Sequence, residues 1–292
     1  MKIGLFTPLR SPVATPEFLS RLGTACDERG IHSLWMGEHV VMFPEYESSY
    51  PGSKDGVFRF PDQSGLLDMV SGLSFLAACT TDVRLGTGIC ILPQNNPVYV
   101  AKEYATVDFL SSGRLEFGVG VGWSWEEFEA CGVPFEHRGA RCDEYLEIIT
   151  KLWTEPVSSY EGRFYNLRDC IMYPKPVQQP MAPITIGGHS KAALKRTARY
   201  GQGWYGINIG PDETAEVIAE IDRYLEAEGR PAGDVRIIIG AVNDQIKPEL
   251  IDQYAEVGVD EVLIPFLRQG TKHLDANLDN LTPYLEAALA CG

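Results

Sequence analysis

The chain has 292 residues, of which 45% are hydrophobic and 22% charged, a composition typical of a soluble globular protein. A formal net charge of −15 at pH 7 argues against nucleic acid and anionic membranes as partners, because both require a basic surface. We also expect no membrane span and no signal peptide, because no apolar run reaches about 18 residues and the start MKIGLFTP is short and soon polar.

In chain order, short β-rich runs alternate with longer helical ones. Strands are predicted over residues 2–6, 33–37, 83–91, 115–121, 184–187, 203–206, 235–240 and 261–265. Helices are predicted over residues 16–29, 66–80, 97–110, 141–153, 191–200, 212–228, 249–257 and 274–290. Thr15 and Pro16 look like a helix N-cap followed by proline at the first helical position, and Gly30 ends that helix. Ser190 and Pro211 open two others.

Eight strands that alternate with eight helices predict an α/β fold, a parallel (β/α)8 TIM barrel that forms a single domain over residues 1–292. Two insertions interrupt the repeat. Residues 43–64, after the second strand, are rich in Tyr, Pro, Gly and Ser and predict a lid-like loop at the end of the barrel where sites lie. Residues 155–183, between the fourth helix and fifth strand, predict a hairpin around Glu161 and Gly162 and then a proline-rich connector.

The cysteines and histidines show no metal-site pattern. The seven cysteines have no CxxC spacing, so the sequence predicts reduced thiols and a cytoplasmic location. The five histidines are scattered, and no His/Cys/Asp group has the spacing of a zinc site. We therefore expect no bound metal.

The segment RLEFGVGVGWSWEEF, residues 114–128, places Gly118, Gly120 and Gly122 two residues apart. It is not the dinucleotide motif GxGxxG, because the spacing differs and no acidic residue follows a second strand about 20 residues on. A period of two puts the glycines on one face of a strand, where a flat ligand or another strand can lie against bare backbone. Tight packing inside the barrel is the alternative that the spacing leaves open.

Longer stretches resemble the luciferase-like flavin and deazaflavin oxidoreductases. These stretches are LWMGEHV, the run from VRLGTGICILP to EEFEACG, and PITIGGHSKAALKRTARYGQGW, and the likeness covers most of residues 1–206 in the family's order. The resemblance is closest to the actinobacterial branch that uses coenzyme F420, an 8-hydroxy-5-deazaflavin. It implies a TIM barrel, in agreement with the element count, with the cofactor across the C-terminal mouth of the barrel.

The resemblance implies a set of cofactor contacts. Gly118, Gly120 and Gly122 would leave room for the ring, and Trp123 and Trp125 would wall the cavity. A bulge with a non-proline cis peptide at Gly88-Ile89 would press against the ring. A plain buried strand is the alternative at Gly88 and Ile89. The full set of implied cofactor-binding residues is Thr87, Gly88, Ile89, Gly120, Gly122, Trp123, Gly187, Gly188, His189 and Lys191.

Glu38 and His39 follow the second predicted strand, where a barrel presents catalytic groups. The similar deazaflavin dehydrogenases carry an acidic residue followed by histidine here, and the histidine supports hydride transfer at the ring. A histidine titrates near neutrality, so it can stabilise charge on the ring or relay a proton. The alternatives are a structural histidine held by hydrogen bonds and a glutamate that only orients the local backbone.

The segment from Gly187 to Ser190 joins the fifth predicted strand to a helix, and a helix N-terminus favours an anion. In the family this turn meets the phosphate-bearing tail of the cofactor. A basic stripe on the same helix would give an acidic protein a local positive patch, although a solvated helix face is the alternative. The stripe consists of Lys191, Lys195 and Arg199.

The resemblance implies hydride exchange between C5 of F420 and a small organic substrate that is apolar or planar, because the expected cavity is aromatic. The family's glucose-6-phosphate dehydrogenases place a catalytic glutamate directly after the glycines, whereas this chain has Trp123, so a sugar phosphate is not expected. Glu126 and Glu127 are interpreted as helix caps. Two alternatives stay open, an FMN-dependent luciferase-like monooxygenase and a cofactor-binding protein without turnover. The sequence also leaves a homodimer open.

Overall fold

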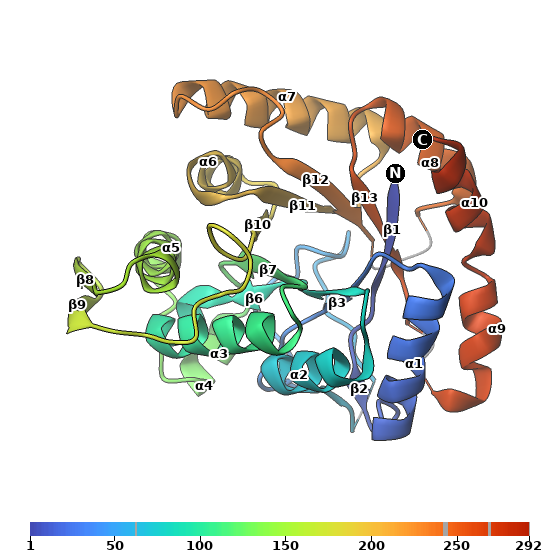
Figure 1. Ribbon diagram of the computed structural model, residues 1–292, viewed down its shortest axis with the longest axis horizontal. Coiled ribbons are helices and arrows are strands. Elements are labelled where there is room, and N and C mark those ends of the chain that lie inside the picture. Colours follow the sequence, from blue (N-terminus) through green and yellow to red (C-terminus); the bar gives the residue numbers. More distant parts are fainter. Residues whose placement is uncertain (62, 242–244, 268–269, 292) are drawn as a thin grey trace.

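The computed structural model describes residues 1–61, 63–241, 245–267 and 270–291, and its centre is a closed barrel of parallel strands (Figure 1). The strands pair in the order β10, β11, β12, β13, β1, β3, β5 and β7, and the pairing of β7 with β10 closes the ring. The barrel strands are β1 (Lys2–Phe6), β3 (Ser33–Met36), β5 (Arg84–Thr87), β7 (Leu115–Gly120), β10 (Ile184–Gly187), β11 (Gly203–Ile207), β12 (Arg236–Gly240) and β13 (Glu261–Pro265). The predicted (β/α)8 TIM barrel is therefore confirmed.

Helices surround this barrel (Figure 1). They are α1 (Pro16–Arg29), α2 (Met69–Cys79), α3 (Pro97–Leu110), α4 (Trp125–Ala130), α5 (Arg138–Thr154), α6 (Lys191–Tyr200), α7 (Pro211–Ala227), α8 (Ile251–Glu256), α9 (Leu274–Asp279) and α10 (Thr282–Ala290). The predicted start of α1 is confirmed, because the Thr15 hydroxyl accepts a hydrogen bond from the Phe18 N–H at 3.2 Å. Gly30 ends that helix with a φ of 68°, a conformation that glycine adopts without steric cost.

Several predicted helix bounds are wrong. The second helix does not include residues 66–68, because Gly65 and Leu66 form strand β4 (Gly65–Leu66), which pairs with β2 (Arg10–Ser11). Asp68 then caps α2 by accepting from the Ser71 N–H at 2.8 Å. The last predicted helix is two helices, α9 and α10, and α5 begins three residues earlier than expected. Helix α4 was not predicted.

The predicted hairpin is confirmed. It consists of β8 (Ser158–Glu161) and β9 (Asn166–Cys170), and it projects from the barrel at the left of Figure 1. The Gly162 N–H donates to the Tyr165 carbonyl at 3.0 Å and closes the turn. The other insertion, residues 43–64, has no helix or strand among its described residues; Asp62 lies outside them.

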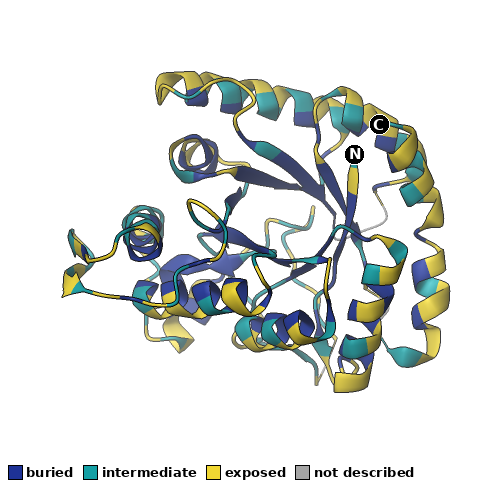
Figure 2. Ribbon diagram, viewed as in Figure 1, coloured by how far each residue is buried: buried dark blue, intermediate teal, exposed yellow. Residues whose placement is uncertain are grey.

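The hydrophobic core occupies the strands and the inner faces of the helices, while the outer helix faces are exposed (Figure 2). Within the barrel, a separate buried cluster consists of Phe6, Trp35, Tyr205, Ile238 and Leu263. The rings of Trp35 and Tyr205 stack with centroids 5.8 Å apart. Among the described helices, none is long and apolar enough to cross a membrane.

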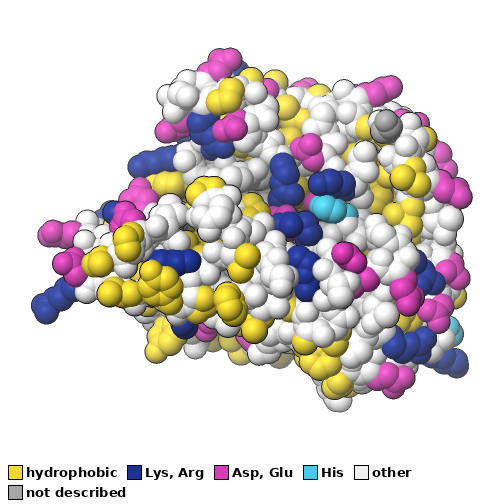
Figure 3. All heavy atoms as spheres, viewed as in Figure 1, with side chains coloured by type: hydrophobic (Ala, Val, Ile, Leu, Met, Phe, Trp, Pro, Cys, Tyr) yellow, Lys and Arg dark blue, Asp and Glu magenta, His cyan; other side chains and the backbone are white. Residues whose placement is uncertain are grey.

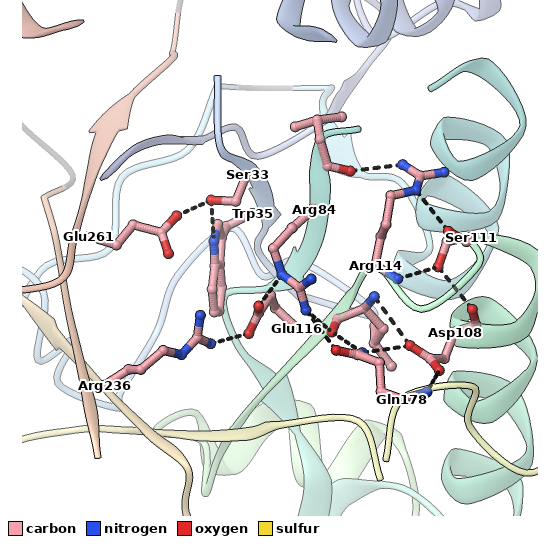
Figure 4. A network of polar contacts seen from close by, with 12 residues as sticks. Ser33, Trp35, Arg84, Asp108, Ser111, Arg114, Glu116, Gln178, Arg236 and Glu261 are labelled. Atoms are coloured by element: carbon pink, nitrogen blue, oxygen red, sulfur yellow. Dashed lines mark hydrogen bonds and ion pairs between the residues drawn. The ribbon is translucent and has the colours of Figure 1, made fainter. Parts of the chain in front are cut away.

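A polar layer closes the barrel at the N-terminal ends of the strands (Figure 4). Glu116 accepts hydrogen bonds from both Arg84 and Arg236 and is 1% exposed. The Ser33 hydroxyl donates to Glu261 and accepts from the Trp35 indole N–H at 2.8 Å. Oε2 of Glu261 is buried with no hydrogen-bond partner among the described residues.

A cavity of about 460 Å³ opens beside this layer and is lined in part by Lys2, Arg236 and Glu261. Figure 3 shows Lys and Arg side chains gathered near the centre of one face of the molecule. Such gathering stands out in a chain whose formal net charge is −15. The cavity lies at the end of the strands opposite to the one where barrel enzymes carry their sites.

Candidate functional site at the C-terminal mouth of the barrel

The segment that follows β5 lies inside the mouth. The Gly88–Ile89 peptide is cis, as predicted, and it separates β5 from the short strand β6 (Cys90–Ile91). Thr87 is fully buried and its hydroxyl donates to the Gly118 carbonyl at 2.6 Å. The Ile89 side chain lies over Gly120 and Gly187 and packs on the buried cluster inside the barrel. Ile89 therefore forms part of the floor of the mouth.

The glycines at positions 118, 120 and 122, in and just after β7, serve a different purpose from the one expected. A side chain at Gly118 would collide with the Thr87 carbonyl, and one at Gly120 would collide with the Ile89 side chain. Gly122 has a φ of 73°, and a side chain there would meet Ile91. The expectation that the bare faces of these glycines leave room for a ring is thus wrong, because the protein's own β5–β6 segment fills that space. The packing alternative holds.

His39 lies at the mouth and is held by a residue that sequence analysis had interpreted as a helix cap. Its Nδ1 lies 2.9 Å from Oε2 of Glu127, and the two side chains are 10% and 1% exposed. The other carboxylate oxygen of Glu127 accepts from the Val40 N–H at 2.6 Å. The imidazole also packs against Phe58 and Trp123, with ring centroids 4.9 and 5.9 Å away.

Glu38 directly precedes His39 and contacts the backbone of β6. Its carboxylate accepts a hydrogen bond from the Ile91 N–H, which ties the end of β3 to β6. Burial raises the pKa of Glu38 to about 7, and the charge of Glu127 adds to the rise, although the bond from Ile91 opposes it. The bond from Ile91 supports the alternative that Glu38 orients the local backbone, and its catalytic role stays a prediction.

The loop of residues 43–64 covers the mouth with aromatic side chains. Trp123 is the centre of this cluster, and its ring lies 5.1 Å from Tyr46, 5.1 Å from Tyr50 and 5.3 Å from Phe58, measured between centroids. The Asn208 side chain at the end of β11 donates to the Gly52 carbonyl at 3.0 Å. The loop thus reaches across the mouth. We call residues 43–61 and 63–64 the lid below.

Glu126 anchors the lid. Its carboxylate accepts hydrogen bonds from the backbone N–H groups of Glu47 and Ser48, at 2.7 and 2.9 Å, and from the hydroxyls of Ser48 and Ser124, at 2.7 and 2.8 Å. Burial opposes ionisation of this carboxyl, but the bonds from Ser48 and Ser124 outweigh it and lower the pKa of Glu126 to about 2. The lid is therefore held by an ionised carboxylate.

The turn between β10 and α6 lies at the same end of the barrel. Gly188 has a φ of 109°, and its carbonyl accepts from the Trp204 indole N–H at 2.9 Å. The Ile207 N–H donates to Nε2 of His189 at 3.1 Å, and Ser190 caps α6 through the Ala193 N–H at 3.2 Å. The turn is thus rigidly held beside the mouth, with Lys191 exposed at the first position of the helix.

The rest of the basic stripe serves other contacts. The Lys195 ammonium lies 5.5 Å from the centre of the Tyr224 ring, and Arg199 forms an ion pair with Glu147 at 3.2 Å. Both residues follow Lys191 along α6, away from the turn. These contacts favour the alternative of a solvated helix face for Lys195 and Arg199, and Lys191 stays a predicted contact of the cofactor tail.

Tyr205 carries one of several buried polar atoms that have no hydrogen-bond partner among the described residues. The Tyr205 hydroxyl makes no hydrogen bond to any described residue, although the side chain is only 5% exposed. A side chain at Gly240, the last residue of β12, would collide with this hydroxyl, so it lies toward the mouth. Burial raises the pKa of Tyr205, with a further rise from nearby Tyr50 of the lid. A hydroxyl so placed can donate to a ligand that enters beneath the lid.

Sequence analysis missed Glu127, Glu126 and Tyr205. The spacing of Ser124 and Glu127 matches the capping-box pattern, which predicts that the carboxylate turns back to the start of its own helix. Only half of that pattern forms, because Ser124 does cap the Glu127 N–H at 3.2 Å while the carboxylate reaches His39. The partners are 88 positions apart, so local spacing could not find them. The structure describes no group of three or more metal-ligating side chains.

Comparison with known proteins identifies the family. Residues 1–243 match the model of the luciferase-like monooxygenase family. An uncharacterized protein of Mycobacterium tuberculosis is 30% identical over 278 residues, which cover 94% of this chain and 95% of that protein. An F420-dependent glucose-6-phosphate dehydrogenase of Kineococcus radiotolerans is 30% identical over 227 residues, 75% of this chain and 61% of that enzyme.

Among solved structures, an F420-dependent secondary alcohol dehydrogenase in complex with an F420-acetone adduct superposes with a TM-score of 0.78. The superposition covers 98% of each chain at 15% sequence identity. An identity this low supports the shared barrel fold and no assignment of cofactor or substrate to the present chain.

Proposed function

Because the chain belongs to the luciferase-like monooxygenase family, we propose that it is an F420-dependent oxidoreductase that acts on an apolar or planar organic substrate. The observation that carries the proposal is His39, held by Glu127 at the mouth beneath an aromatic lid. The deazaflavin would supply hydride exchange at its C5. The protein supplies orientation, exclusion of water and electrostatic stabilisation.

The residues at the mouth fit such a cofactor. The Tyr205 hydroxyl is a buried polar atom without a partner among the described residues, and Tyr50 and Phe58 of the lid, together with Trp123, offer flat aromatic surfaces. The turn at Gly187, Gly188 and His189 lies at a helix N-terminus, which suits the negative charge of a phosphate-bearing tail. Lys191, exposed at the first position of α6, would add a positive charge.

His39 would then stabilise charge on the ring or move the proton that accompanies hydride transfer. A preorganised group in a site shielded from water contributes most at this step. The lid provides that shield, since its aromatic rings pack on Trp123 and His39. A sugar phosphate remains disfavoured as substrate, because Trp123 fills the position directly after the glycines and packs against the aromatic rings of the lid.

The preference for F420 over FMN rests on the sequence resemblance and on the Kineococcus enzyme, which matches over three quarters of this chain. The test is titration of the purified protein with each cofactor, followed by quenching of tryptophan fluorescence, since Trp123 lies at the mouth. We expect F420 to bind at least about tenfold tighter than FMN, a difference of about 1.4 kcal/mol. Equal or reversed affinities would favour an FMN-dependent monooxygenase.

Replacement of the histidine tests the catalytic role. His39→Ala should lower turnover about 100-fold or more, the scale of a positioned acid–base group, and should change cofactor affinity far less. A screen of planar and apolar alcohols, ketones and imines with oxidised and reduced F420 supplies the substrate. A parallel loss of affinity and rate would make His39 a binding residue, and no change in either would make it structural. No turnover with any substrate would favour a binding protein.

A further inference from the structure

We propose that Glu127 is the positioning residue of His39. It holds the imidazole in the tautomer that carries its proton on Nδ1, so that Nε2 is the nitrogen offered to a ligand at the mouth. The catalytic meaning of this tautomer rests on the proposed function, whereas the tautomer itself can be measured without any cofactor.

The two hydrogen-bond contacts of the Glu127 carboxylate determine which nitrogen of His39 carries the proton. Its Oε1 accepts from the Val40 N–H at 2.6 Å, and its Oε2 lies 2.9 Å from Nδ1 of His39. A carboxylate only accepts hydrogen bonds, so Nδ1 has to be the donor. Both groups are shielded from water, with exposures of 1% and 10%, so solvent competes little for this bond.

The capped N-terminus of helix α4 fixes the position of Glu127 relative to His39. Ser124 caps the helix by accepting from the Glu127 N–H at 3.2 Å, and its own hydroxyl donates to Glu126. The capping contact holds the backbone of Glu127, and the carboxylate is free to leave its own helix. Val40 follows His39 directly, so the two oxygens of Glu127 fix two consecutive residues of the segment after β3.

The second ring nitrogen of His39, Nε2, is the one that the contact with Glu127 leaves available. No described residue forms a hydrogen bond with Nε2 of His39. The imidazole packs beside Phe58 of the lid and Trp123, which also contact each other. Carboxylates that hold Nδ1–H in this manner fix the tautomer and stabilise the protonated ring. Glu127 would therefore let Nε2 accept a proton and keep the resulting charge.

The first test is nuclear magnetic resonance of protein labelled with ¹⁵N-histidine, with the His39 signals assigned by their loss in His39→Ala. In the wild type we expect the neutral ring to carry its proton on Nδ1. In Glu127→Gln the amide oxygen should keep the Val40 N–H, and the amide NH2 should then donate to Nδ1. The proton should move to Nε2. Glu127→Asp, which keeps the charge, should retain the Nδ1–H form.

Glu129→Gln is the matched control, because Glu129 lies exposed on the same helix and has no contact with His39. It should leave the tautomer and the turnover unchanged. Glu127→Gln should lower turnover by at least about tenfold, as expected when a catalytic histidine takes the wrong tautomer, while KM stays near the wild-type value. The pH profile of its turnover should also differ, and Glu127→Asp should restore part of the rate.

A wild-type ring protonated on Nε2, or an unchanged tautomer in Glu127→Gln, would overturn the proposal. These outcomes do not depend on cofactor or substrate. If the tautomer moves as expected but F420 supports no turnover in any variant, the positioning role stands and the proposed function fails. If Glu127→Gln does not fold, the tautomer measured in the wild type and in Glu127→Asp still tests the positioning role of Glu127.

Discussion

Glu126 and Glu127 are chemically identical neighbours that perform different tasks. They lie in the first turn of α4, and their carboxylates point in different directions. Glu126 holds Ser48 of the lid, and Glu127 holds His39 below it. The sequence shows two acidic residues at the start of a helix, where the helix dipole stabilises negative charge. It does not show which partner each carboxylate contacts. Contacts across 78 and 88 positions decide that.

The hydroxyl of Tyr205 provides a test at the same scale. A buried hydroxyl without a partner costs about 1–3 kcal/mol, so Tyr205→Phe should stabilise the protein without ligand by about 1 kcal/mol. The same change should weaken binding of cofactor or substrate about 3- to 30-fold, if the hydroxyl donates to a ligand. Urea unfolding and fluorescence titration measure the two effects. Unchanged affinity would show that Tyr205 serves packing alone.

The lid and α4 act together as elements. The lid has no helix or strand among its described residues, so side chains hold it in place: Glu126, Asn208 and the aromatic contacts of Trp123. Loops held in this way open more readily than strands and helices. A lid that both covers the site and opens suits an enzyme whose ligands have to enter and leave.

Removal of the Glu126 anchor should loosen the lid. Glu126→Gln loses acceptors for the hydroxyls of Ser48 and Ser124, and proteolysis within residues 43–64 should become several-fold faster while the barrel stays intact. Ser48→Ala, which removes one of these donors, should have a smaller effect in the same direction. Cleavage rates equal to those of the wild type would show that the aromatic contacts suffice.

The contacts that Glu126 makes with the lid should weaken in acid. The pKa of Glu126 is lowered to about 2 from an ordinary value of 4.5, so the ionised form stabilises the lid above pH 4.5. This contribution is lost as the pH falls from 4.5 toward 2. Tryptophan fluorescence of Trp123 should therefore change in this window in the wild type. In Glu126→Gln the change should be absent or much smaller.

At the scale of the whole molecule, the two ends of the barrel differ: one carries the candidate site and the other a buried polar layer. The mouth carries His39, the lid and the turn after β10, while the opposite end is closed by Glu116 with its two arginines and by Glu261 with Ser33. Burial raises the pKa of Glu261 to about 7, and the charge of Glu116 adds to the rise, although the bond from Ser33 opposes it. We therefore expect this layer to affect stability rather than chemistry.

The raised pKa of Glu261 determines how the stability of the protein changes with pH. Between pH 4.5 and about 7 the folded protein holds a proton on Glu261 that the unfolded chain has lost, so the contribution of this group falls as the pH rises through that range. Glu261→Gln stays neutral and should gain stability over the wild type as the pH rises, by roughly 1–3 kcal/mol at pH 8 and little at pH 5. Urea unfolding at both pH values measures this gain.

Glu256→Gln serves as the control, because Glu256 is exposed on α8, and its effect should not differ between pH 5 and pH 8. A gain in Glu261→Gln that is the same at both pH values would mean that the buried carboxyl stays ionised throughout. The source of the gain would then be packing and not the proton.

The sequence by itself determined the barrel, because hydrophobic periodicity and helix caps such as Thr15 and Ser190 are local signals that the tertiary structure only assembles. With the family resemblance it also predicted the cis Gly88–Ile89 peptide and the position of His39 just after the second barrel strand. Only the tertiary structure decided what the glycines of β7 accommodate, which of two glutamates supports His39, and that Lys195 and Arg199 turn to other partners. The physical reason is that spacing along a strand or helix fixes the direction of a side chain, whereas the atom it meets comes from a distant segment.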